Sequence, residues 1–272
     1  MRVLHILADD PLSPTGGLGV AVDEITKRQN NVAVLCCSSQ HIEEAVVNFY
    51  NRKVVRACLQ AHGQVHGGLK YTRQLNKGMI NALLRHYGRD SFDAIHLHDT
   101  VCWDTADAAR NLFKCPVILT SHLSFAVENL GWEDWNQNSD VDLQNELTAS
   151  AESIVTSVSR AYAQEVQKTL MLDKPVYIIP NGIDTKPIED AVPVDLKSIC
   201  GDRKPVYFCG RVVTTKGIEL ILKAAEALPD YHFMLFANIA MHHGDLMPLA
   251  RKITTAQFML DNITWFKDFP FR

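Results

Sequence analysis

The sequence predicts an α/β fold in which helices cover both faces of doubly wound, mainly parallel sheets. Short apolar runs alternate with segments of helical periodicity along nearly all of the 272 residues. Most of these runs are rich in Val, Ile and Leu and lack the polar alternation of a half-exposed strand. Glycine, histidine and charged residues follow several runs, at the carboxyl ends of strands where open α/β sheets bind ligands.

Nine runs are predicted as strands and five segments as helices. The strands are expected at residues 3–8, 32–37, 94–97, 116–120, 153–157, 176–179, 206–209, 233–236 and 263–266. The helices are expected at residues 69–87, 103–113, 142–151, 160–170 and 217–228, the fourth of them capped by Ser159. Such alternation favours parallel strands joined by right-handed crossovers.

The segment after the sixth strand is expected to separate two domains. Pro180, Asn181 and Gly182 are typical of a turn, and a polar, proline-containing stretch follows them. We therefore place an N-terminal Rossmann-like domain at residues 1–183 and a second domain at residues 184–272. The second domain holds only three predicted strands, which is few for an independent core.

The composition favours a cytoplasmic globular protein. A net charge of −4 and a pI near 6.2 give no overall attraction to nucleic acid or to an anionic membrane. No apolar run reaches the length of a membrane span. The seven cysteines include no C-x-x-C pair, and Cys36, Cys37, Cys115 and Cys209 lie in or beside apolar runs. This is how small buried thiols are used in a reducing compartment.

A glycine cluster follows the first strand. Gly16, Gly17 and Gly19 lie between this strand and the next helix, where glycine lets the backbone approach a ligand closely. Their spacing is not that of a dinucleotide-binding fingerprint. A plain turn would use the same residues, and the local sequence leaves both interpretations open.

Polar residues also follow the third and fourth strands. Alternation places His96 and His98 on one face, an arrangement that binds metal in some hydrolases, but no further ligands are evident and no metal is expected. Asp99 at a carboxyl strand end is better placed to face a cleft. For His122, directly after Ser121, a structural and a functional role both remain open.

The segment 205–217 combines the features of an anion site. The strand at 206–209 ends at Gly210, Arg211 follows at once, and Lys216 precedes a helix. Backbone N–H groups and the helix dipole at a helix N-terminus favour an anion. An Arg fork and a Lys point charge suit phosphate oxygens. We interpret the segment as a phosphate or diphosphate site, with solvated surface charges as the alternative.

In this order, the motifs resemble the retaining, nucleotide-sugar-dependent glycosyltransferases of family 4, which include relatives of bacterial glycogen synthase. The resemblance covers nearly the whole chain and rests on residues 16–19, 98–99, 121–122, 154–159, 180–184, 210–211 and 216–217. It implies the GT-B fold, in which two Rossmann-like domains face each other across a cleft. The N-terminal domain would form the acceptor side, and the second domain the nucleotide-sugar donor side.

The resemblance implies a binding site for the donor diphosphate in the second domain. Arg211 and Lys216, with Gly210 beside them, would bind the donor diphosphate and stabilise the leaving group as its charge develops. The family uses no metal or other cofactor for this step. Arg211, Lys216 and His122 are therefore the expected catalytic residues.

The remaining roles belong to the first domain. Gly16, Gly17 and Gly19 would form a glycine-rich loop over the donor phosphates, His122 would contact the transferred sugar, and Asp99 would line the acceptor side. The expected partners are a nucleotide-sugar donor and a sugar, glycan or lipid-linked acceptor. The sequence names neither of these compounds and leaves the oligomeric state open.

One departure from the family leads to two alternative functions. The family carries a glutamate pair spaced E-x7-E after the strand that resembles 263–266, and this pair contacts the donor sugar and ribose. No pair in 184–272 has this spacing, since Glu219 and Glu226 form E-x6-E. We therefore expect a truncated second domain. The alternatives are a non-catalytic remnant that binds a nucleotide or a partner chain, and a sugar-nucleotide epimerase of the same fold.

Overall fold

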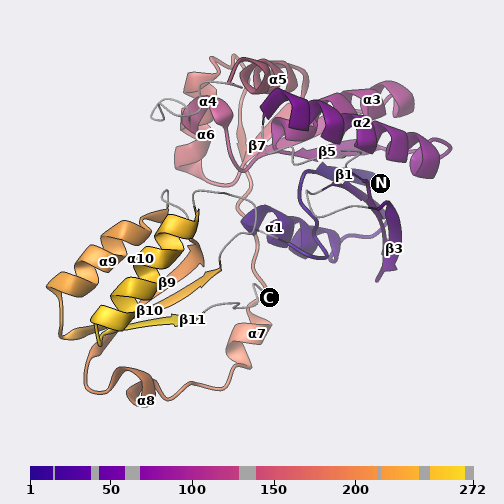
Figure 1. Ribbon diagram of the computed structural model, residues 1–272. Coiled ribbons are helices and arrows are strands. Elements are labelled where there is room, and N and C mark those ends of the chain that lie inside the picture. The colour runs from indigo at the N-terminus through magenta and orange to yellow at the C-terminus, as the bar shows by residue number, and fades with distance from the viewer. Residues whose placement is uncertain are drawn as a thin grey trace. The chain divides into compact units, whose positions relative to one another are not determined.

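The computed structural model describes residues 1–14, 16–37, 43–58, 68–128, 139–212, 216–238 and 246–266. The chain divides into two compact units, Met1–Asp184 and Thr185–Arg272 (Figure 1). Among the described residues, no helix is both long enough and apolar enough to cross a bilayer.

The first unit is built on an eight-stranded sheet in the order β3-β4-β2-β1-β5-β6-β7-β8. The strands are β1 (Val3–Leu7), β2 (Val32–Cys36), β3 (Ala45–Phe49), β4 (Arg52–Arg56), β5 (Ala94–His98), β6 (Val117–Ser121), β7 (Ile154–Ser157) and β8 (Tyr177–Ile178). All neighbouring pairs are parallel except β3 and β4. The order reverses between β1 and β5, and the carboxyl ends of strands at such a reversal form the usual ligand site of an open α/β sheet.

Helices cover both faces of this sheet (Figure 1). They are α1 (Gly17–Thr26), α2 (Gly68–Tyr87), the 3₁₀ helix η1 (Thr100–Cys102), α3 (Trp103–Phe113), α4 (Phe125–Glu128), α5 (Ser139–Glu152) and α6 (Arg160–Thr169). On one face, Met79 of α2 and Ala106 of α3 pack in the same core as Ile6. On the other, Val22 of α1 packs with Val34. Coverage of both faces explains why the central strands are apolar at nearly every position.

The second unit is a three-stranded parallel sheet in the order β11-β10-β9. Its elements are α7 (Lys186–Glu189), α8 (Leu196–Cys200), β9 (Lys204–Arg211), α9 (Ile218–Ala227), β10 (Tyr231–Asn238), α10 (Leu246–Met259) and β11 (Ile263–Phe266). Ile218 of α9 and Ile253 of α10 pack against Phe233 and Leu235 of β10. Figure 1 shows both helices over the same face of this sheet.

The predicted α/β fold class is confirmed, and all nine predicted strands are present. All five predicted helices are also present, and Ser159 caps α6 by accepting a hydrogen bond from the amide of Tyr162 at 3.2 Å. The expectation that Cys209 is buried is wrong, since its side chain is exposed. β9 is an edge strand, and Tyr207 on the same face as Cys209 is also exposed.

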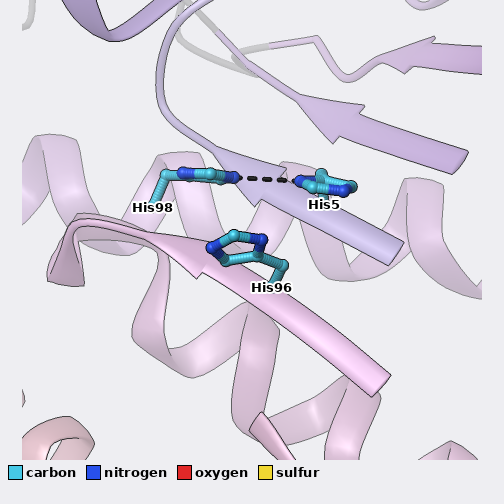
Figure 2. A group of neighbouring side chains, drawn as sticks. All are labelled: His5, His96 and His98. Carbon is cyan, nitrogen blue, oxygen red and sulfur yellow. Dashed lines mark hydrogen bonds between the residues drawn. The ribbon is translucent and has the colours of Figure 1, made fainter. Parts of the chain in front are cut away.

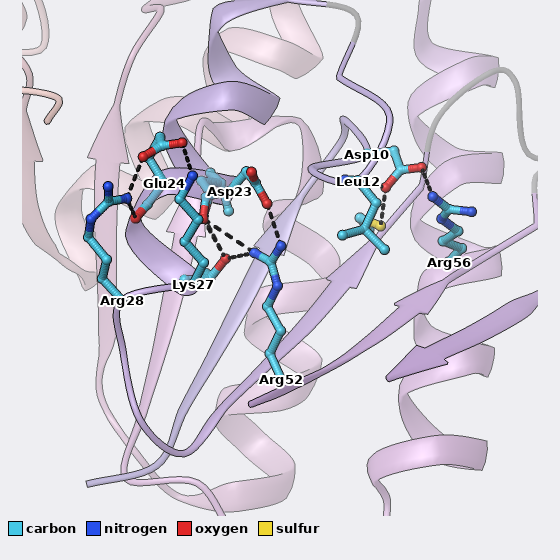
Figure 3. A network of polar contacts seen from close by, with 11 residues as sticks. Asp10, Leu12, Asp23, Glu24, Lys27, Arg28, Arg52 and Arg56 are labelled. Atoms are coloured by element: carbon cyan, nitrogen blue, oxygen red, sulfur yellow. Dashed lines mark hydrogen bonds and ion pairs between the residues drawn. The ribbon is translucent and has the colours of Figure 1, made fainter. Parts of the chain in front are cut away.

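Charged side chains fasten α1 to β4 (Figure 3). Arg52 of β4 is buried, and its guanidinium pairs with Asp23 and donates to Thr26, both on α1. Arg56 pairs with Asp10 at 2.8 Å, which ties β4 to the loop after β1. The guanidinium of Arg52 is no longer hydrated in the folded chain. If its carboxylate partner were removed, nothing would offset the free energy lost by this desolvation.

We expect Asp23→Asn to lower the free energy of unfolding by about 2 kcal/mol, because Arg52 then stays buried without its charge partner. Urea denaturation followed by circular dichroism measures the loss. Asp90→Asn is the matched control, since the Arg2–Asp90 pair is partly exposed and should contribute less than about 0.5 kcal/mol. Equal losses in the two variants would contradict the role given to burial.

Candidate functional site

The candidate site lies at the carboxyl edge of the sheet in the first unit. Asp9 and Asp10 follow β1, Asp99 follows β5, and His122 follows β6. These three strands are adjacent and parallel, so their loops emerge side by side next to the point where the strand order reverses.

Asp99 ties the end of β5 to the loop after β6. Its Oδ1 accepts hydrogen bonds from the amides of His122 at 2.7 Å and Leu123 at 2.9 Å, and its own amide donates to the carbonyl of Thr120 at 3.0 Å. The backbone of Asp99 has φ 56° and ψ 169°, a conformation that is nearly restricted to glycine. The residue whose side chain holds the loop after β6 therefore also has a strained backbone.

The carboxyl group of Asp99 loses its proton at a much higher pH than an ordinary aspartate does. Burial raises its pKa to about 7, against the opposing effect of the two amide donors, and the carboxylate of Glu146 adds to the increase. Both amides point at Oδ1, which leaves Oδ2 to carry the proton. A neutral acid in this arrangement accepts with one oxygen and can donate with the other.

His122 is held at both its backbone and its ring. Its amide donates to Asp99, and its Nε2 lies 3.2 Å from Nδ1 of His98. Burial lowers the pKa of His122 to about 4, so the ring is neutral near pH 7. A neutral imidazole can exchange hydrogen bonds with a hydroxyl group and does not attract a phosphate as a cation would.

Three histidines project from one face of β1 and β5 (Figure 2). His5 lies opposite His96 in the parallel register, and one ring nitrogen from each of His5, His96 and His98 falls within 4.8 Å of the others. The predicted shared face of His96 and His98 is confirmed by ring centres 4.1 Å apart. His5 was not predicted as a site residue, because its only signal in the sequence was its place in the first strand. Three imidazoles are the protein ligand set of some catalytic zinc sites.

The glycine cluster forms the start of α1, so the expectation of a glycine-rich loop is wrong for Gly17 and Gly19, which lie in the helix. The amide of Gly19 donates to Oδ2 of Asp9 at 3.0 Å. A Cβ on Gly19 would stand 2.6 Å from that oxygen and 2.8 Å from Cβ of Pro14, whereas Gly16 and Gly17 have open space. Close packing thus requires glycine at position 19 alone within the cluster.

In the second unit, Gly210 and Arg211 end β9. The side chain of Arg211 and residues 213–215 lie outside the described residues. Lys216 is exposed, and no described carboxylate pairs with it. Gly217 precedes α9 with φ 73°, the left-handed conformation that favours glycine. A Cβ on Gly210 would make only ordinary van der Waals contact. The predicted order of strand, cations and helix is therefore present along the backbone.

Comparisons with known proteins point to one family. The sequence profile of glycosyltransferase family 4 matches residues 16–187, which is more than half of the chain. A search of curated protein sequences gave no match.

Several solved structures share the fold at low sequence identity. Sucrose-phosphate synthase from Thermosynechococcus elongatus has a TM-score of 0.76 at 14% identity, over 99% of this chain and 71% of its own. HepE from Anabaena in complex with UDP and glucose has a TM-score of 0.71 at 14% identity, over 99% and 70%. The catalytic domain of starch synthase IV from Arabidopsis thaliana, bound to ADP and acarbose, has a TM-score of 0.67 at 17% identity, over 99% and 74%. These likenesses confirm the predicted GT-B fold.

We expect the stability of Asp99→Asn relative to wild type to increase as the pH rises from about 4 to about 7, and to stay constant above that. Between the ordinary pKa of Asp, near 4, and the folded value of about 7, the folded chain holds a proton that the unfolded chain has lost. The free energy of unfolding of the wild type therefore falls through this window. Asn keeps an acceptor at the Oδ1 position and cannot ionise.

Urea denaturation of both proteins from pH 4 to pH 9 measures this difference, and the histidines contribute equally to both curves. Asp99→Leu is the matched control, since it removes the acceptor for both amides, cannot ionise either, and should lie about 2 kcal/mol below Asp99→Asn at every pH. A constant difference between Asp99→Asn and wild type over the whole range would show that Asp99 ionises normally.

Gly19→Ala should lower the free energy of unfolding by about 1–3 kcal/mol, because the added Cβ displaces the carboxylate of Asp9 from the start of α1. Gly17→Ala, two residues earlier, meets open space and should change it by less than about 0.5 kcal/mol. Thermal unfolding of the two variants compares them directly. Similar losses at both positions would mean that the contact with Asp9 is unimportant.

Proposed function

The chain belongs to glycosyltransferase family 4, and we propose that it transfers a sugar from a nucleoside diphosphate sugar to an acceptor hydroxyl with retention of configuration. The observation that carries the proposal is the neutral His122 after β6, fixed by Asp99 and His98 next to the point where the order of a family 4 sheet reverses. HepE, solved with UDP and glucose, and starch synthase IV, solved with ADP and acarbose, support a nucleotide and a sugar as ligands.

The proposed reaction exchanges one bond at the anomeric carbon for another. The bond from this carbon to the diphosphate oxygen breaks, and the acceptor oxygen bonds to the carbon on the same face. The proton of the acceptor hydroxyl leaves with the nucleoside diphosphate. Negative charge accumulates on the departing diphosphate, so cations positioned before the reaction lower the barrier.

Arg211 and Lys216 of the second unit supply these cations in our proposal. Arg211 ends β9, and Lys216 is exposed just before α9. The α9 N-terminus adds unpaired amides and the positive end of the helix dipole. Gly210 and Gly217 let the backbone run close to the phosphates. With two cations on the diphosphate, the proposed reaction involves no metal and no other cofactor.

The first unit binds sugar hydroxyls in this proposal. His122 contacts the transferred sugar with its neutral ring, and Asp99 serves the acceptor side by fixing the loop that carries His122. Gly16 and Gly17 start α1 with open space above them, where the helix amides can face donor phosphates. The acceptor is a sugar, a glycan or a lipid-linked hydroxyl compound.

Arg211→Ala is expected to lower kcat/KM by about a hundredfold or more, because it removes charge stabilisation at the leaving group. Purified protein is incubated with a panel of UDP-, ADP- and GDP-sugars and with mono- and oligosaccharide acceptors, and the products are identified by NMR. The control, Lys223→Ala, removes an exposed cation from α9 and should leave the rate unchanged.

Each outcome of this assay has a distinct meaning. A glycoside with the anomeric configuration of the donor supports the proposal, and inversion rejects retention. An epimerised nucleotide sugar identifies an epimerase, and donor binding without turnover identifies a binding protein. Turnover that survives Arg211→Ala unchanged rejects the role assigned to Arg211.

A further inference from the structure

A continuous line of hydrogen bonds runs from the interior of the first unit to His122. Nε2 of His122 lies 3.2 Å from Nδ1 of His98, and Nε2 of His98 lies 3.0 Å from Nδ1 of His5. Nε2 of His5 in turn lies 2.8 Å from Oε1 of Gln29, in the turn after α1. His5 and His98 are fully buried, at 0% and 1% exposure. Bulk solvent therefore does not reach the ring nitrogens of His5 and His98.

The rings meet nitrogen to nitrogen along this line. The ring centres of His5 and His98 are 5.3 Å apart and the planes differ by 15°. With nitrogens 3.0 Å apart, such a separation means that the rings lie in line, as Figure 2 shows. Two imidazoles on zinc, with bonds of about 2.0–2.1 Å at a tetrahedral angle, need nitrogens about 3.3 Å apart and lone pairs that converge at an angle. The geometry therefore favours a hydrogen bond over a metal site.

Gln29 sets the direction of every bond in the line. The structure turns Oε1 of its amide toward His5, and this oxygen can only accept, so with this amide orientation His5 carries its proton on Nε2. A neutral imidazole has one N–H group, so Nδ1 of His5 accepts and His98 donates to it from Nε2. By the same rule, Nδ1 of His98 accepts from Nε2 of His122. The lone pair of His122 then lies on Nδ1, with which no described residue forms a hydrogen bond.

We propose that His5 and His98 are positioning residues that hold His122 as its Nε2–H tautomer, so that Nδ1 of His122 accepts a hydrogen bond from a hydroxyl of the sugar substrate. This inference rests on the proposed glycosyl transfer. It assigns His122 to an O–H donor and excludes a phosphate oxygen, which would face a lone pair. Burial keeps all three rings neutral by lowering the pKa of His5 and His122 to about 4 and that of His98 well below its usual value.

The first test reads the tautomers directly. The full chain is labelled with ¹⁵N-histidine, and its long-range ¹H–¹⁵N spectrum is recorded at pH 7.5, with assignments from single variants. We expect His5, His98 and His122 all to carry the proton on Nε2. A proton on Nδ1 of His122 overturns the inference, and so does a spectrum that changes when EDTA is added, since that change would indicate a bound metal. The readout needs no turnover, so it is independent of the proposed reaction.

The second test measures the hydroxyl contact through donor affinity. In the wild type, one deoxy position of the donor sugar should weaken binding about tenfold, the value of one hydrogen bond. His98→Leu releases the ring of His122, so the variant should bind the intact donor about tenfold more weakly than wild type does. It should bind the intact donor and the deoxy donor with equal affinity. His98→Asn offers His122 an acceptor in nearly the same place and should restore much of the affinity.

A control variant and a second line-breaking variant complete this measurement. His96→Leu removes a neighbouring imidazole that bonds Thr120 and lies outside the line, and it should leave the deoxy effect intact. Gln29→Met interrupts the same line at a half-buried turn, for the case that His98→Leu does not fold, and should reduce the deoxy effect. Equal losses for every deoxy donor in wild type and in the folded line-breaking variants overturn the inference. Correct tautomers and a deoxy effect without any transfer would reject the proposed reaction alone.

Discussion

The hydrogen bond between His5 and His98 joins β1 to β5, the two strands between which the sheet order reverses. Both rings are buried away from solvent, so each ring nitrogen needs a protein partner. A nitrogen without one would lower the free energy of unfolding by its whole desolvation free energy. Only two arrangements of protons satisfy such a line, and Gln29 selects one of them. A requirement of the core therefore determines which nitrogen His122 presents at the edge of the sheet.

Asp99 adds a second constraint at the same edge. Its backbone occupies a conformation nearly restricted to glycine, and its carboxyl is buried beside Glu146. Both features destabilise the folded chain, and they are offset by two hydrogen bonds to the loop that carries His122. Strain of this kind is typical of sites where one placement of a side chain matters more than local stability. His122 is thus fixed at its amide by Asp99 and at its ring by His98.

The sequence could predict what depends on local pattern. The central strands are buried on both faces and carry an apolar signal at most positions. The edge strands β8 and β9 are partly exposed, but their apolar runs gave the same signal, so all nine were found. The β3–β4 hairpin was missed, since it lies at the edge of the sheet and mixes charged with apolar residues. Alternation along one strand was enough to place His96 and His98 on one face. The partnership with His5 depends on the register between β1 and β5, which is a property of the folded sheet.

The roles of residues within the site were less predictable, because they too depend on partners that only the folded chain brings together. Gly16, Gly17 and Gly19 look alike in the sequence, and only the approach of Asp9 shows that Gly19 alone is closely packed. A carboxylate after a strand suggests a ligand contact, yet Asp99 uses its Oδ1 to hold two amides of the same protein. In both cases the decisive partner lies in a neighbouring loop that no spacing rule identifies.

A crystal structure of the wild-type chain with a nucleoside diphosphate sugar bound would test the central claim most directly. The account predicts a sugar hydroxyl within hydrogen-bond distance of Nδ1 of His122, and diphosphate oxygens bonded to Arg211 and Lys216. A phosphate oxygen against the ring of His122, or a nucleotide sugar bound away from Arg211 and Lys216, would contradict it.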